Sequence, residues 1–455
     1  GGISSISGEE NHENGDPAYR GVFGSKLGVI GASHVRFFNE KAFLKTTLSY
    51  SGTELESIDE YVNDDNEFYE EENIAISKNT IRLQSTYNYK FNAQHKMETG
   101  VILSRLGYDA QGKIFNHDTD QLEDVLKDKG STETVQGFVS WKYRMNDNWT
   151  LTSGLHSLYF NLNESISLEP RVAIRWKATP RSSFNAGVGI HSKLSTVSTY
   201  LARIPQDNGT IWQPNKNLKP AKAAHFVLGY DYQLSPQSHI KVEAYYQQLY
   251  QLLVEDDPNS SFAVLNEFDA YGSMPLVNEG KGKNYGLELT YERFFHNGLY
   301  YMSTVSLYES LYTAKDGVER STAFNGNYIV NFIGGKEFAI GQPDKNRVMF
   351  VNAKLALLGG GRYTPIDLAA SQEAGTEIYD ETNMLGKQGE DVFFLNLSVG
   401  IRRNKGNTTR ELKLDANNVT GNQALVREYY LQPTEEIEKS YQLPMIPNIV
   451  YTFKF

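Results

Sequence analysis

The sequence predicts an all-β fold, an antiparallel transmembrane β-barrel with about 17 strands in this chain. Three observations predict it. Apolar and polar residues alternate with a period of two, many of these runs continue for roughly 11 to 16 residues, and tight turns alternate with longer connections. Strands of soluble proteins have about 5–6 residues, whereas about 9–11 tilted residues cross a bilayer. The runs are therefore long enough to span a membrane.

The alternation recurs from near the start of the chain to its end. Clear examples lie at 81–91, 168–176, 285–291, 393–401 and 412–416. Their polar positions carry charged residues such as Arg171, Glu288 and Lys413, which cannot sit in a dry core. A wide barrel with a wet or plugged interior accommodates them. The alternative, a sheet with one solvated face, is disfavoured because the strands are too long and too many.

The connections differ in length in a regular way. Tight polar turns are expected at 39–40, 92–93, 146–148, 179–180, 235–236, 296–297, 342–344 and 405–406. Longer segments are expected at about 53–73, 109–131, 193–218, 255–280, 360–390 and 421–440, with short links near 161–165 and 316–320. Short turns on one rim and long loops on the other are typical of outer-membrane barrels. A propeller or a sandwich would show no such alternation.

The strand count has a consequence for the ends of the barrel. Two strands for each of eight short turns, plus the last one, give an odd number, and the first of these strands is expected near 20–33. Bacterial single-chain barrels have even strand numbers. We therefore expect one barrel domain over residues 1–455, incomplete at its N-terminal side, with an odd number of strands outside this chain.

Composition excludes several classes of protein. There is no cysteine, so disulfides, cysteine-ligated metals and a cysteine nucleophile are excluded. The net charge of −11 argues against binding to nucleic acid, which needs a basic surface. No apolar run of 18 or more residues predicts a transmembrane helix.

Several segments together resemble a known family. "NKNLKPAKAAHFVLGYDYQL" (215–234) is similar to the Asn-x-x-Leu-x-Pro loop and following strand of TonB-dependent outer-membrane receptors. "VNEGKGKNYGLELTYERFF" (277–295), "ERSTAFNGNYIVN" (319–331), "GGRYTPIDLAAS" (360–371) and "LDANNVTGNQ" (414–423) resemble segments of the Bacteroidetes branch. The resemblance is good over 215–455 and vaguer before residue 215.

The resemblance implies a 22-stranded barrel in the outer membrane of a Gram-negative bacterium, with an N-terminal plug in its interior. It implies active import of a scarce nutrient (a siderophore, haem, cobalamin, a glycan or a peptide), driven by TonB, ExbB and ExbD through a TonB box. On this basis about five strands, the plug and the TonB box lie outside this chain. A surface lipoprotein over the loops is a further candidate partner, and no cofactor is expected.

An acidic segment at 53–73 is the candidate metal site. It holds ten acidic residues and no basic one, and its central candidates are Asp64, Asp65 and Glu67. Clustered carboxylates suit hard cations, although the spacing matches no calcium loop. The alternative is a solvated loop tip.

Aromatic residues in the long segments are the candidate ligand contacts. They are Tyr200, Trp212, Phe268, Tyr271 and Tyr379. Exposed aromatic side chains make good recognition surfaces. The same residues could instead pack the loops together or belong to the aromatic belt at the membrane interface.

No catalytic residues are expected. "GKGKNYG" (280–286) lacks the spacing of a dinucleotide-binding loop and precedes a strand instead of a helix. The nine histidines show no zinc-binding spacing, and nothing marks a Ser–His hydrolase, although such partners need not be close in sequence.

The chain ends on "NIVYTFKF" (448–455), in which Ile449, Tyr451, Phe453 and Phe455 share one face of a strand. In a closed barrel the last strand pairs with the first, so its edge needs no cap. A terminal Phe with aromatic residues two and four positions earlier also resembles the signal that the outer-membrane assembly machinery recognises.

The expected function is therefore active nutrient import by an outer-membrane receptor. A passive porin, or a structural barrel within an outer-membrane complex, is the alternative. A plug sequence upstream would favour import, and strands alone would favour a pore.

Overall fold

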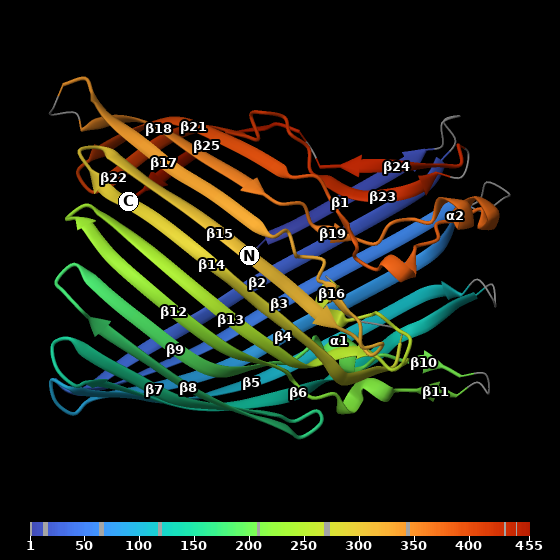
Figure 1. Cartoon of the computed structure of the whole chain (residues 1–455), viewed down its shortest axis with the longest axis horizontal. Helices are drawn as coiled ribbons and strands as arrows, with labels where there is room; N and C mark the ends of the chain where they lie inside the picture. Colours follow the sequence, from blue (N-terminus) through green and yellow to red (C-terminus); the bar gives the residue numbers. More distant parts are fainter. Residues whose placement is uncertain are drawn as a thin grey trace.

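The computed structural model describes residues 2–11, 17–62, 68–116, 121–206, 210–267, 274–342, 346–431, 434–442 and 444–455. Within these residues one antiparallel sheet of 19 strands makes up the wall of the molecule (Figure 1). Each long strand pairs with the next long strand along the chain. The all-β antiparallel fold predicted from the sequence is confirmed.

The strands of this sheet, in chain order, are β1 (Gly2–Asn11), β2 (Pro17–Asn39), β3 (Ala42–Val62), β4 (Phe68–Lys90), β5 (His95–Asn116), β6 (Gln121–Arg144), β7 (Trp149–Phe160), β8 (Ser165–Lys177), β9 (Ser182–Lys193), β12 (Ala221–Ser235), β13 (Ser238–Glu255), β14 (Leu276–His296), β15 (Leu299–Thr313), β16 (Glu319–Ser321), β17 (Tyr328–Ile340), β18 (Arg347–Leu358), β21 (Val392–Lys405), β22 (Thr408–Asn417) and β25 (Ile446–Lys454).

The longer connections fold into short elements at one end of the wall, on the right in Figure 1. These elements are α1 (Val197–Tyr200), β10 (Ile204–Pro205), β11 (Ile211–Trp212), η1 (Pro214–Asn217), η2 (Val264–Asn266), β19 (Arg362–Tyr363), α2 (Leu368–Ala374), η4 (Glu381–Asn383), β20 (Lys387–Gln388), β23 (Leu425–Leu431) and β24 (Glu436–Tyr441). We call them, with the segments that join them, the loop layer. None of the helices among the described residues is long and apolar enough to cross a membrane.

Seven of the eight predicted short turns lie where the sequence placed them, at the opposite end of the wall, and the eighth, at 342–344, lies mostly outside the described residues. The turn between β14 and β15 shows why its residues suit it. Asn297 and Gly298 both have a positive φ, 52° and 74°, as a two-residue type I′ hairpin turn requires. Glycine and asparagine adopt this conformation more readily than other residues.

The expected strand count was too low, because two strands were missed. β1 precedes the first predicted strand, and the three-residue β16 lies in the short link near 316–320. Setting β16 aside, the number of strands in the described wall is even. Whether further strands lie outside this chain, and how many, stays a prediction.

Two of the predicted long loops, 53–73 and 109–131, were also wrong. Most of their residues belong to β3–β6, which have 21 to 24 residues each. The acidic residues were taken as a sign of a loop, but some are paired across strands: Arg20 with Glu60 at 2.5 Å and Lys26 with Glu54 at 2.7 Å. Ile74 packs beside this region in a buried cluster with Ile76, Ala110, Val125 and Leu126.

Among the described residues, the sheet has two edges. β1 pairs only with β2, along Gly2 to Asn11, and β25 pairs only with β22. Residues 28–39 of β2 therefore have a partner on the β3 side alone. The expected pairing between the last and the first strand is not among these ladders.

The outer face of the wall is apolar and carries a row of aromatic rings near the short turns. Trp149 stacks on Trp176 with ring centres 5.3 Å apart, Trp176 on Phe184 at 5.4 Å, and Phe184 lies 4.8 Å from Tyr230. Such a row is typical of the aromatic belt at a membrane interface. The buried apolar clusters, in contrast, lie towards the opposite end of the wall and within the loop layer.

Candidate functional site

The side chains of β8 show how the wall separates its two faces. Leu168 and Val172 are 59% and 45% exposed on the apolar face, whereas Glu169 is only 3% exposed. Arg171 lies on the same side as Glu169 because strand side chains alternate. A membrane barrel turns its polar face inward, so we assign Glu169 and Arg171 to the interior.

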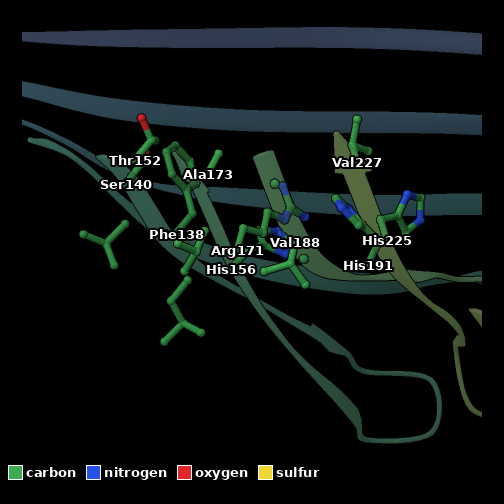
Figure 2. A pocket seen from close by; sticks show the side chains of 16 residues that line it. Phe138, Ser140, Thr152, His156, Arg171, Ala173, Val188, His191, His225 and Val227 are labelled. Carbon is green, nitrogen blue, oxygen red and sulfur yellow. The ribbon is translucent and has the colours of Figure 1, made fainter. Parts of the chain in front are cut away.

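A groove of about 540 Å³ lies on this interior face, across β6–β9 and β12. Figure 2 shows His156 and Arg171 at its middle and His191 beside His225 at one side. We call it the histidine groove. It is lined by Phe138, Val139, Ser140, Thr152, Gly154, Leu155, His156, Arg171, Val172, Ala173, Gly187, Val188, Gly189, His191, His225 and Val227.

Strand register explains why the wall is hollow here. One cross-strand row runs from Gly154 through Arg171 and Gly189 to His225. The two glycines on either side of Arg171 carry no side chain, which leaves room beside the guanidinium group. A Cβ on Gly189 would approach Arg171 Cγ to 3.0 Å, closer than an ordinary contact. Glycine at these two positions therefore leaves a hollow in the wall around Arg171.

The buried carboxylate of Glu169 is fully compensated. Arg171 Nη2 donates a hydrogen bond to its Oε2 atom at 2.7 Å, and Ser167 Oγ donates to its Oε1 atom at 3.0 Å. His156 Nδ1 lies 3.1 Å from Oε2, and His156 Nε2 lies 3.1 Å from Gln136 Oε1. A buried charge with such partners is held in place, because separating the pair would leave it uncompensated.

The other two histidines of the groove, His191 and His225, have fewer polar contacts. The ring centres of His191 and His225 lie 4.5 Å apart, with the planes inclined at 59°. His225 Nδ1 lies 3.4 Å from Gln247 Nε2. Among the described residues no hydrogen bond involves the ring of His191, or Nε and Nη1 of Arg171. These nitrogen atoms are therefore available to a ligand.

The loop layer beside the groove has its own apolar core. Tyr200, 1% exposed, packs against Phe160 with ring centres 5.2 Å apart, within a cluster that also holds Leu218, Leu253 and Leu276. Burial raises the pKa of Tyr200 to about 12. The loops over β7–β14 are therefore packed segments.

A buried asparagine ties two of these loops together. Asn215 Nδ2 donates to the Met274 carbonyl at 3.1 Å, and its Oδ1 accepts from the Leu276 amide at 2.8 Å. Asn215 and Leu218 are the first two fixed positions of the Asn-x-x-Leu-x-Pro segment. That segment therefore acts here as a structural clamp between connections.

A second clamp joins the loops at 359–391 and 418–445. Lys387 Nζ donates to both carboxylate oxygens of Glu428, at 2.8 and 2.9 Å, and Tyr363 donates to Oε1 at 3.1 Å. Glu428 is buried. The hydrogen bond to Glu428 raises the pKa of Lys387.

The sequence matches the family described as TonB dependent receptor-like, beta-barrel, over residues 10–419. The chain belongs to this family. Its barrels are outer-membrane proteins of Gram-negative bacteria and are transport receptors, not enzymes, in agreement with the sequence analysis. No match was found among curated proteins.

Several solved receptor structures share the fold at low sequence identity. The ferric-catecholate import receptor Fiu from E. coli K12, in its closed form, is 11% identical with a TM-score of 0.65, over 97% of this chain and 65% of that chain. The ferric preacinetobactin receptor BauA from Acinetobacter baumannii is 12% identical with a TM-score of 0.63, over 96% and 63%.

The pyoverdine receptor FpvA from Pseudomonas aeruginosa PAO1, bound to pyoverdine, is 13% identical with a TM-score of 0.65, over 96% of this chain and 61% of that chain. This chain thus spans less than two thirds of the length of these receptors. At such identity the likeness concerns the fold.

The predicted ligand contacts of this TonB-dependent barrel fall in different surroundings. Tyr200 is buried, which favours the loop-packing alternative for this residue. Trp212, 47% exposed on β11, and Tyr379, 46% exposed, lie on the surface of the loop layer. The Tyr379 hydroxyl donates to Glu377, and burial together with this bond raises the pKa of Tyr379. Phe268 and Tyr271 lie outside the described residues.

The predicted metal ligands Asp64, Asp65 and Glu67 of the receptor also lie outside the described residues. Elsewhere in the described chain, no group of three or more His, Asp or Glu side chains is placed to hold a metal ion.

The C-terminal residues of the receptor barrel share one face, as expected. Ile449 and Tyr451 lie opposite Leu414 and Leu412 of β22. Ile449, Tyr451, Phe453 and Phe455 are all exposed on the apolar side of the wall.

The histidine groove of the TonB-dependent barrel was not found from the sequence. Arg171 was recognised as an interior charge, but the histidines were read as single residues. His156, His191 and His225 are separated by more than 30 residues along the chain and meet only through the pairing of β7–β9 with β12. Their shared position on the polar face is the one signal that the sequence offers.

Proposed function

We propose that this chain is the barrel of an outer-membrane receptor that actively imports a scarce nutrient through TonB. The observation that carries the proposal is the family match over residues 10–419. The polar interior and the packed loop layer support it, because such a receptor needs a selective binding surface at the outer end of a rigid wall.

We infer that energy coupling uses parts outside this chain. We propose a plug in the interior, a TonB box and contact with TonB, ExbB and ExbD. The two sheet edges support further strands, because unpaired backbone groups at the edges of β2 and β25 are costly in a bilayer. If the complete barrel has 22 strands, about four more strands are needed beyond the described wall, with the short β16 not counted.

The nutrient could belong to any class that the sequence analysis named: siderophore, haem, cobalamin, glycan or peptide. The similar solved structures include receptors for ferric siderophores, which favours that class. We propose that Trp212 and Tyr379 on the loop layer, with Phe268 and Tyr271, contact the ligand or a surface lipoprotein. The four segments at 277–295, 319–331, 360–371 and 414–423 support a place in the Bacteroidetes branch.

Uptake measurements test this function. Cells that express the protein should accumulate the labelled nutrient, and deletion of TonB or addition of a protonophore should abolish accumulation. A passive porin would behave differently: it would let small solutes into liposomes without energy, and uptake in cells would survive the loss of TonB. That result would overturn the proposal.

We further propose that Ile449, Tyr451, Phe453 and Phe455 are recognised by the outer-membrane assembly machinery. Phe455→Ala should reduce the amount of folded barrel in the membrane several-fold. Phe295→Ala, another exposed aromatic residue, on β14, is the matched control and should assemble normally. Equal assembly of the two variants would contradict the assignment.

A further inference from the structure

We propose that the histidine groove binds an anionic group, a carboxylate or a phosphate, on a ligand whose remaining part is apolar. The inference deepens the proposed function, on which it rests for the assumption that ligands enter the interior. It names the chemistry that this part of the wall recognises.

The titratable side chains that line the groove are all basic. They are His156, Arg171, His191 and His225, and no carboxylate is among the lining residues. The nearby carboxylate of Glu169 lies behind Arg171 and already accepts hydrogen bonds from Arg171 and Ser167, with His156 Nδ1 3.1 Å away. An anion that entered the groove would therefore meet hydrogen-bond donors without meeting a repelling charge.

The donors are uncommitted and close together. Arg171 uses only Nη2 for Glu169, and among the described residues its Nε and Nη1 atoms have no hydrogen-bond partner. Its guanidinium is held by Glu169, while about half of the side chain remains exposed. A guanidinium fixed in this way suits the planar carboxylate and the phosphate group. The imidazoles of His191 and His225 add N–H donors whether they are neutral or charged.

The shape of the groove favours a small or flat ligand portion. Gly154 and Gly187 leave the wall bare beside Ala173 and Thr152, and Phe138 and Val227 provide apolar walls. A volume of about 540 Å³ falls within the usual range of ligand sites, about 300–1,000 Å³. The groove therefore offers space next to its donors.

A metal ion is the rival occupant of a histidine cluster. Two observations favour the anion instead. No set of three ligating side chains is suitably placed within the described chain. In addition, the guanidinium of Arg171 faces the same space and would repel a cation.

Binding is tested on purified protein in detergent, labelled at its histidine rings for NMR. The probes are inorganic phosphate, benzoate, and benzamide, which has the shape of benzoate without its charge. The ring signals of His191 and His225 should move saturably with phosphate and benzoate, and at least about tenfold more benzamide should be needed for the same change.

Variants locate the site. Arg171→Gln alone would leave Glu169 buried without its cation, so the test variant is Arg171→Gln with Glu169→Gln. It should weaken benzoate binding about tenfold or more, and His191→Gln should weaken it several-fold. His239→Gln is the matched control, because His239 lies beside Glu292 near the turn at 236–237, away from the groove.

Two glycine-to-leucine variants test the site by steric blocking, without changing any charge. Gly187→Leu should block benzoate binding, since a Cβ at this position has only ordinary contacts and the side chain would extend into the groove. Gly137→Leu makes the same change on the outer face, where a Cβ would meet nothing within 4 Å, and should bind normally.

The inference is overturned if benzamide binds as well as benzoate, if neither anion produces a saturable change, or if the double variant and Gly187→Leu bind like the unchanged protein. Anion binding without energy-dependent uptake would sustain the groove and overturn the proposed transport. TonB-dependent uptake without anion binding would support the proposed transport and overturn the anion site.

Discussion

The extracellular ends of β3–β6 and of β7–β14 are built in different ways. β3–β6 continue as strands of 21 to 24 residues, whereas β7–β9 have only 12 or 13 residues. A short turn at 161–164 joins β7 to β8, and the long, folded loops follow β9 and β13. The first region is stabilised by cross-strand pairing and one small cluster, and the second by packing between loops. The wall is therefore extended by longer strands at β3–β6, whereas packed loops cover the strand ends from β7 to β14.

The largest expected effect comes from breaking the packing of the loops. Tyr200→Ala removes a fully buried ring from its contact with Phe160 and should destabilise the loop layer by about 3–5 kcal/mol. Hydrogen exchange at 194–220 measures this loss. Trp212→Ala, at an exposed position, is the control. If both variants exchange at the same rate, the loop layer is not held by this cluster.

The same kind of change on the other side should have a somewhat smaller and local effect. Ile74→Ala removes a side chain that is fully buried between β4 and β6 and should cost about 2–4 kcal/mol. The extended ends of β3–β6 should then become sensitive to protease, while the loop layer stays resistant. Ile81→Ala on the outer face of the same strand is the comparison, and greater sensitivity there would contradict the role of the cluster.

The second loop clamp should contribute less. Glu428→Gln removes the partner of Lys387 and should loosen the loop at 359–391 by about 1–3 kcal/mol, seen as faster hydrogen exchange. Because the pKa of Lys387 is raised, the pair's contribution is complete below the pKa of a free lysine and is lost as pH rises through the raised value. The protection of the amides at 359–391, measured relative to their intrinsic exchange rates, should therefore be insensitive to pH near neutrality.

The smallest effect is expected for the exposed ion pairs of β2 and β3. Lys26 and Glu54 are both more than half exposed. Exposed pairs of this kind add little to stability. Lys26→Ala should leave the melting temperature unchanged within error at both low and high salt. A clear loss at low salt would mean that charges, and not the apolar cluster, hold the extended strands.

Period-two alternation was enough to predict the faces of the strands, and polar turn residues were enough to predict the short turns that the structure describes, because both follow from local residue types. It failed at 53–73 and 109–131, where charged residues suggested loops. Some of these residues are paired across strands, such as Glu60 with Arg20 and Asp109 with Lys129. Local pattern cannot identify partners across strands, since strand register is a property of the whole sheet.

The same dependence on contacts between distant residues explains why the candidate sites were predicted only in part. Asn215 and Leu218 were recognised from their motif, but their role as a clamp depends on Met274 and Leu276, about 60 residues later. The groove around Arg171 depends on four strand pairings at once. Exposed aromatic residues were easier to propose, yet burial separates Tyr200 from Trp212, and burial is set by tertiary packing.

The row of rings formed by Trp149, Trp176, Phe184 and Tyr230 has a consequence for the path of a ligand. If these rings lie at the inner surface of the membrane, β7 ends near the outer surface, whereas β6, with 24 residues against 12, continues for about 40 Å further along its strand. The extracellular rim is then stepped. The step beside β7–β9 is occupied by the loop layer, where the Arg203 amide donates to the Val125 carbonyl of β6 at 3.1 Å. A solute from that side therefore meets packed loops before it reaches the histidine groove, whereas on the side of β3–β6 it meets extended strands.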